Sequence, residues 1–120
     1  MRYTIYQIKE EHTRDYGYMG IDMLKRMSAI SGEDSIIKED GNGTVTIDMF
    51  PYEKVYENTE EQVELEELYS RFNARHPKDY RGRSLSVSDI VFLDYTPYYC
   101  DSFGFTKIAV TNIPAPARNH

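Results

Sequence analysis

The 120-residue sequence contains one cysteine, no tryptophan and no long apolar run. Because Cys100 stands alone, a disulfide within the chain is excluded, and no C-x-x-C or H-x-x-x-H spacing indicates a metal site. The longest uninterrupted apolar run, Ile90 to Leu93, is far shorter than a membrane-spanning helix requires. No secretory signal pattern follows Met1. We therefore expect a cytoplasmic protein with no metal, no other cofactor and no membrane partner.

Positive charge is also scarce. The chain has 14 Lys and Arg residues against 20 Asp and Glu residues, which gives a net charge of -6. Duplex DNA binding relies on many cationic contacts to phosphates, so this balance argues against that role. Hydrophobic residues make up 40%, which is an ordinary globular share, and the length suits one domain. We predict a folded domain over residues 1–112 and a flexible C-terminal tail over 113–120.

Hydrophobic periodicity in the first half of the chain predicts strands around one short helix. A strand is expected over Arg2–Ile8, centrally in a sheet, because β-branched and aromatic residues occupy both of its faces. Residues 9–17 are polar and without period, which predicts a loop. Apolar residues at every third position predict a helix over 20–30. The turn residues Asp40–Gly43 between apolar pairs are typical of a β-hairpin.

A second helix is predicted over residues 60–75, after a strand at 52–56. Thr59 and Gln62 have the spacing of a capping box at the start of that helix. The helix has one apolar stripe, which we expect to pack on apolar strand residues. The stripe consists of Leu65, Leu68, Tyr69 and Phe72, and the expected receiving residues are Ile5, Ile90 and Phe92.

The last third of the chain predicts strands at 84–88, 90–93, 98–102 and 105–110. Taken with the first two thirds, this order describes a small α+β domain with two helices and a mostly antiparallel sheet.

Three serines alternate with apolar residues before Asp89. Hydroxyls and a carboxylate in a tight turn would suit an anion or a nucleotide, but such side chains more commonly bond the amides of the turn itself. We favour the structural interpretation, in which Ser86, Ser88 and Asp89 hold the turn and Gly104 allows a later bend. No G-x-S-x-G motif indicates a serine hydrolase.

Five cations lie between residues 71 and 83, a basic connector in an acidic chain. Together with the aromatic strands over 95–105, it predicts binding of single-stranded nucleic acid or a nucleotide through phosphate contacts and base stacking. The opposing interpretation pairs half of these cations with the acidic run over 60–67 or with neighbouring loops, and we favour it because the net charge of -6 would repel a polyanion. The candidate binding residues are Arg75, His76, Lys78, Tyr80, Arg81, Arg83, Tyr98, Tyr99 and Asp101.

Evidence for catalysis is weaker. A histidine beside a carboxylate would make a general base, so a hydrolytic or transferase site around His76, Ser86, Asp89 and Asp101 is a third hypothesis. Cys100, in a predicted strand without a cationic neighbour, is expected to pack as a small apolar side chain. We therefore expect no enzyme activity and assign no catalytic residue.

The run from His76 to Val91 and the segment Tyr98–Phe105 resemble the YodL-like domain family. Residues 3–8, 52–56 and 65–73 also fit its pattern, so the resemblance covers most of 3–108. It departs at 31–48, where any site would be specific to this protein. Such domains are similar to parts of bacterial mobile-element and large polyvalent proteins, often beside antirestriction and DNA-processing modules.

The resemblance implies a protein-interaction role in a mobile element or in regulation of its bacterial host, with an unidentified protein partner. It supplies no catalytic residues. The eleven tyrosines are consistent with this role, because tyrosine is enriched where protein surfaces meet. A non-catalytic protein-interaction module is therefore our first hypothesis, and nucleic acid or nucleotide binding by the connector 71–83 is the alternative.

Overall fold

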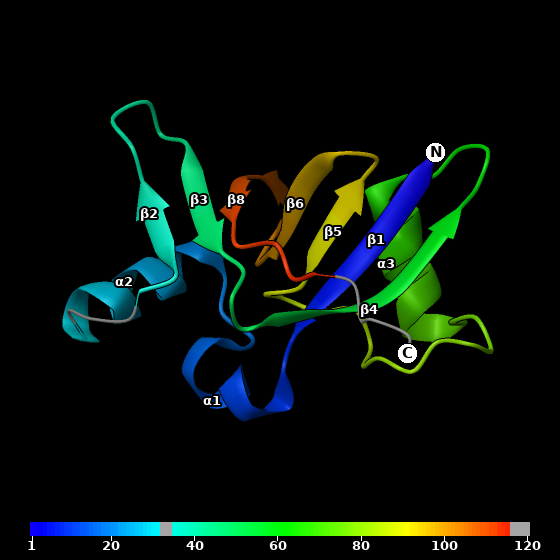
Figure 1. Ribbon diagram of the computed structural model, residues 1–120, viewed down its shortest axis with the longest axis horizontal. Helices are drawn as coiled ribbons and strands as arrows, with labels where there is room; N and C mark the ends of the chain where they lie inside the picture. The colour runs from blue at the N-terminus through cyan, green and yellow to red at the C-terminus, as the bar shows by residue number, and fades with distance from the viewer. Residues whose placement is uncertain (32–34, 116–120) are drawn as a thin grey trace.

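Two β-sheets and several helices make up the computed structural model, which describes residues 1–31 and 35–115 (Figure 1). The larger sheet has the strand order β4-β1-β5-β6-β7, and all its neighbouring strands are antiparallel. Its strands are β1 (Arg2–Ile8), β4 (Tyr52–Thr59), β5 (Ile90–Leu93), β6 (Thr96–Asp101) and β7 (Gly104–Lys107). The predicted α+β class with mostly antiparallel sheets is confirmed.

The smaller sheet has the order β2-β3-β8 and contains a parallel pair, β3 with β8. Its strands are β2 (Ile37–Glu39), β3 (Val45–Asp48) and β8 (Ala109–Thr111). The helices within the described residues are a 3₁₀ turn (Glu10–His12), α1 (Thr13–Tyr16), α2 (Ile21–Ser31) and α3 (Leu65–Ala74). None of them is long and apolar enough to cross a lipid bilayer.

Strand β1 lies inside the larger sheet, and both of its faces are buried, as predicted. On one face, Tyr3 and Ile5 pack with α3, which lies behind β1 in Figure 1. On the other face, Tyr6 and Ile8 pack with α2 and with β3 of the smaller sheet. The five-stranded sheet therefore separates two apolar cores, and α3 and α2 stand on opposite sides of it.

The predicted start of the second helix is wrong. Thr59 ends β4, where it pairs with Arg2 of β1, and α3 begins only at Leu65. Glu64 precedes the helix without a capping hydrogen bond from its side chain, so the Thr59–Gln62 capping box does not form. Pairing with β1 therefore prevails over the local capping signal.

The apolar stripe of α3 is only partly buried, and β5 packs against it with the face opposite to the one predicted. Leu68 and Phe72 are fully buried, but Tyr69 is 42% exposed, which contradicts its predicted place in the core. Ile5 packs with Leu68 as expected, whereas Ile90 and Phe92 belong to the core on the far side of the sheet. The neighbouring residues Val91 and Leu93 face α3 instead.

Three further segments differ in structure from the sequence prediction. Residues 9–17 contain two short helices where a loop was expected, and residues 84–88 form no strand. The strand predicted over 105–110 is divided at Ile108 into β7 and β8, which belong to different sheets. The helix over 20–30, the hairpin at 40–43 and the strand over 90–93 are confirmed. Parts of the predicted tail, 116–120, and of the segment 31–48, residues 32–34, lie outside the described residues.

Candidate functional site

The turn before β5 is tied to the C-terminal end of β1 by a buried polar pair. One carboxylate oxygen of Asp89 accepts hydrogen bonds from the side-chain amide of Gln7 at 3.1 Å and from the backbone N–H of Ser86 at 2.9 Å. Asp89 and Gln7 are each 2% exposed. Burial raises the pKa of the Asp89 carboxyl to about 7, although both hydrogen bonds and the charge of Arg83 oppose that rise.

Ser88 serves the same turn mainly through its backbone. Its φ is +88°, a strained value for a residue other than glycine, and its carbonyl accepts the hydroxyl of Tyr52 at 2.6 Å. Its own hydroxyl accepts the backbone N–H of Tyr18 at 3.0 Å. The predicted turn residues Ser86, Ser88 and Asp89 therefore all bond main-chain or buried polar groups.

Asp101, predicted as a binding residue, holds the start of α2. One of its carboxylate oxygens accepts the backbone N–H of Ile21 at 2.9 Å, and the other accepts the hydroxyl of Thr106 at 3.0 Å. A negative charge is favourable at the N-terminus of a helix. Gly20 makes this approach possible, because a Cβ there would stand 2.8 Å from the Asp101 carboxylate. Gly104 has φ +79° and follows the two-residue turn of the β6–β7 hairpin.

Two of the aromatic residues proposed for base stacking are buried. Tyr80 is 4% exposed and packs edge-on against Phe72, with the ring centroids 4.8 Å apart. Tyr99 is fully buried, and its hydroxyl donates to the carbonyl of Met19. Tyr98 is half-buried within β6. Tyr80 and Tyr99 are unable to stack on bases in this structure, because their ring faces lie inside the protein.

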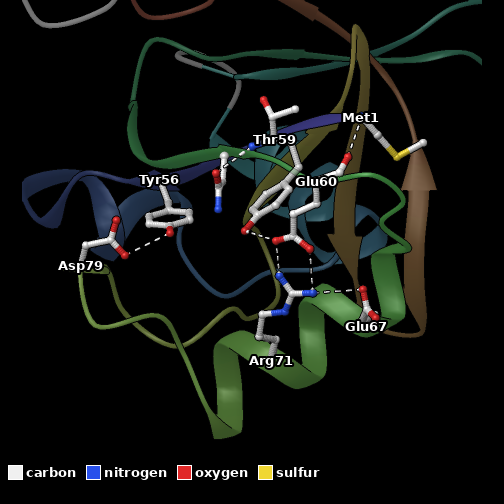
Figure 2. A network of polar contacts seen from close by, with 9 residues as sticks. Met1, Tyr56, Thr59, Glu60, Glu67, Arg71 and Asp79 are labelled. Atoms are coloured by element: carbon white, nitrogen blue, oxygen red, sulfur yellow. Dashed lines mark hydrogen bonds and ion pairs between the residues drawn. The ribbon is translucent and has the colours of Figure 1, made fainter.

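The cations of the basic connector divide into two groups. Arg71 contacts both carboxylate oxygens of Glu60, at 2.5 and 3.2 Å, and Glu67 at 3.1 Å (Figure 2). Glu60 also accepts the hydroxyl of Tyr3, and the ion pair holds the pKa of Glu60 below its usual value. Arg71 is thus neutralised by the acidic run, as the opposing interpretation expects.

The remaining connector cations have no carboxylate within ion-pair distance among the described residues; they are Arg75, Lys78, Arg81 and Arg83. Arg81 and Arg83 donate to main-chain carbonyls instead. The one carboxylate within this stretch, that of Asp79, accepts the hydroxyl of Tyr56 at 3.0 Å (Figure 2).

The proposed catalytic groups are not brought together as a site. A ring nitrogen of the exposed His76 lies 3.0 Å from the carbonyl of Pro77, and the ring packs near Tyr80. Asp89 and Asp101 accept main-chain N–H groups elsewhere. Burial raises the pKa of the Cys100 thiol to about 12, which keeps it protonated and unreactive. Among the described residues, no group of three His, Cys, Asp or Glu side chains has the arrangement of a metal site.

A groove of about 360 Å³ lies between α3 and the β6–β7 hairpin. The rings of Tyr69 and Phe105 meet edge-on across it, with their centroids 6.4 Å apart. Phe103, at the tip of the hairpin, is 98% exposed and lies in sequence between Ser102 and Gly104, which both line the groove. The lining consists of Glu66, Tyr69, Ser70, Val87, Cys100, Asp101, Ser102, Gly104 and Phe105.

Sequence reasoning missed two residues of these arrangements. Gln7 is polar on the face of β1 that carries Tyr3 and Ile5, and a polar residue on an apolar face is a signal of a buried partner. Gly20 immediately precedes the apolar period of α2, where a glycine commonly begins a helix.

The family model of the YodL-like domain matches residues 2–110, so the chain belongs to this family. No curated protein and no solved structure matches it significantly. Family membership is thus the relationship that the comparisons establish.

Proposed function

We propose that this YodL-like domain is a non-catalytic protein-interaction module whose partner docks in the groove between α3 and the β6–β7 hairpin. The observation that carries the proposal is the almost complete exposure of Phe103, which lies in sequence between the lining residues Ser102 and Gly104. Together with Tyr69 and Phe105, whose rings meet across the groove, Phe103 would supply the kind of apolar surface that commonly marks a protein-binding site. Tyr69, 42% exposed on α3, extends the same surface on the opposite wall.

The charge of the groove defines the chemistry of the partner. Among the described residues, its lining contains the acidic residues Glu66 and Asp101 and no cation, within a chain of net charge -6. The carboxylate of Asp101 is already bonded, so Glu66 is the carboxylate that remains for a partner. The partner segment therefore carries an apolar side chain for the groove and a lysine or arginine beside it for Glu66.

Several observations support a non-catalytic role. The carboxylates of Asp89 and Asp101 fix main-chain amides, and the thiol of Cys100 has a raised pKa. We place the module in the cytoplasm, as the sequence leads us to expect, and in a bacterial mobile element or in regulation of its host, as the family resemblance implies. Its partner is a protein of that setting.

Selection from a displayed random peptide library tests the docking groove. We expect the wild-type chain to enrich peptides that pair an aromatic or aliphatic residue with lysine or arginine. Tyr69→Ser and Phe103→Ser should weaken binding of the selected peptides by roughly tenfold or more, which corresponds to about 1.4 kcal/mol or more.

Tyr95→Ser is the matched control for these variants. Tyr95 is 93% exposed in the β5–β6 turn, at the end of β6 opposite Phe103. Binding should survive this change, because the same type of side chain is lost away from the groove. Peptides that bind all three variants like the wild type, or a library that yields no enriched peptide, would overturn the proposal. Capture of the native partner from the host, with mass spectrometry, then identifies the protein.

A further inference from the structure

We infer that the chain has a second binding site, a pocket for the phosphate group of a small molecule, formed by Lys54, Arg81 and Arg83. This site lies beside β4 and the basic connector, and none of its lining residues is shared with the groove on the hairpin side of α3. The inference therefore goes beyond the proposed protein-interaction role and does not depend on it.

The three cations line one surface pocket of about 320 Å³. Glu53 is the one carboxylate among the described residues of that lining, which therefore have three formal positive charges against one negative charge. Lys54 also contacts Glu57 at 3.2 Å, whereas neither arginine has a carboxylate within ion-pair distance among the described residues. Unpaired arginines gathered in a chain of net charge -6 favour an anionic ligand.

Both arginines are held in place before any ligand arrives. Arg81 donates to the carbonyl of Lys78 at 2.9 Å, and Arg83 donates to the carbonyl of Ile8 at 2.8 Å. A guanidinium has five N–H donors in a planar fork, so each side chain keeps donors for a phosphate oxygen. Fixing these side chains in the free protein reduces the entropy that binding would otherwise cost.

The main chain between the arginines is fixed as well. Gln7 accepts the backbone N–H of Arg83 and donates to its carbonyl, both at 2.9 Å. A Cβ on Gly82 would lie 2.8 Å from the side-chain amide oxygen of Gln7 and 2.7 Å from the ring of Tyr80. The close approach of the main chain to these two side chains therefore requires glycine. This close packing makes the pocket a preformed feature of the fold.

The surroundings favour a small phosphate compound over a nucleic acid strand. Binding of single strands combines phosphate contacts with bases stacked on aromatic side chains. Phe72 and Tyr80, the Phe and Tyr residues of the connector, are 0% and 4% exposed and belong to the core. No aromatic residue belongs to the described lining of the pocket. The ligand is therefore inorganic phosphate or a small phosphate monoester.

Calorimetric titration at low ionic strength tests the pocket with three probes: inorganic phosphate, thymidine monophosphate and thymidine. We expect the wild-type chain to bind inorganic phosphate and thymidine monophosphate and to show no binding of thymidine. Arg81→Gln should weaken phosphate binding by roughly tenfold or more, because it removes one fixed cation from the lining. Arg75→Gln is the matched control, since it removes an equal charge from the same connector outside the pocket.

Comparison of inorganic phosphate with thymidine monophosphate distinguishes the two possible ligands. Equal affinity for both means that the free phosphate ion is sufficient for binding, whereas tighter binding of thymidine monophosphate indicates that the ligand is a phosphate monoester. An equal loss in Arg75→Gln and Arg81→Gln would overturn the inference, because it would indicate general charge and no pocket. Absence of phosphate binding by the folded wild type would overturn it as well. A fourth titration uses an oligothymidylate without a terminal phosphate, and tighter, Arg81-dependent binding of this strand would assign the cations to a nucleic acid backbone and also overturn the inference.

Discussion

Replacing Asp89 by asparagine should remove a large pH-dependent contribution to the stability of this protein. Asparagine is close to isosteric with aspartate, and its carbonyl oxygen can accept the same two hydrogen bonds from Gln7 and Ser86. The variant cannot ionise, so it removes the buried charge and keeps the turn. Asp89→Ala, by contrast, leaves the Ser86 amide without a partner and should cost about 1–3 kcal/mol.

The magnitude follows from the difference between the folded and unfolded pKa of Asp89. Burial raises the folded value to about 7 from an ordinary 3.8. The folded state therefore binds the proton more tightly, and this contribution to stability is full below pH 3.8 and lost as the pH rises to about 7. Between about pH 5 and about pH 7 the wild type therefore loses about two pH units of this contribution, which corresponds to about 3 kcal/mol of its free energy of unfolding.

Urea unfolding of wild type and Asp89→Asn at about pH 5 and about pH 9 measures this difference. From the lower to the higher pH, the free energy of unfolding of the variant should rise by about 3 kcal/mol relative to that of the wild type. Other titrating groups are common to both proteins, so their effects largely cancel in the comparison. Parallel pH profiles for the two proteins would refute the reasoning, because Asp89 would then be ionised in the native state at low cost.

Three further outcomes are expected from the fold. Leu68→Ala should destabilise by about 2–5 kcal/mol in urea unfolding, since Leu68 is fully buried, and an unchanged midpoint would contradict its place in the core. Gly20→Ala should lower the melting temperature, because its Cβ would displace the Asp101 cap of α2, whereas Gly41→Ala, with open space around it, should not. Glu60→Gln should reduce the loss of stability toward acid pH relative to wild type, because the lowered pKa of Glu60 contributes stability that disappears as its carboxylate is protonated. An unchanged acid limb of the unfolding profile would contradict that role.

Local sequence patterns predicted the elements whose signals lie within a few residues. The alternation of β1 and the glycine-rich turn at 40–43 depend on neighbours in the chain, and both were predicted correctly. The basic connector was also visible in the sequence, because its cations lie close together. Which of them are neutralised was not visible, since Arg71 reaches Glu60 only after β4 and α3 come together.

Which residues of a strand face a helix, and which polar side chains pair across the fold, depends on the tertiary structure. Ile90, Val91, Phe92 and Leu93 are all apolar, so either alternating set was suitable for packing against α3. Only the register with β1 determines that Val91 and Leu93 face the helix. The role of Gln7 depends on a partner 82 residues away, and no local pattern carries that relationship.

The Gln7–Asp89 pair links the two sites proposed for this domain. Gln7 fixes the main chain of Arg83, which belongs to the phosphate pocket, while Asp89 fixes the amide of Ser86, next to Val87 in the groove lining. Loss of this pair would therefore disturb both surfaces, although Gln7 itself lines the phosphate pocket and Asp89 lines neither site. If an Asp89 variant lost both peptide binding and phosphate binding, the joint loss would indicate displacement of the connector. Variants of Tyr69 and Arg81 test the two sites separately, because each of these residues lines only one site.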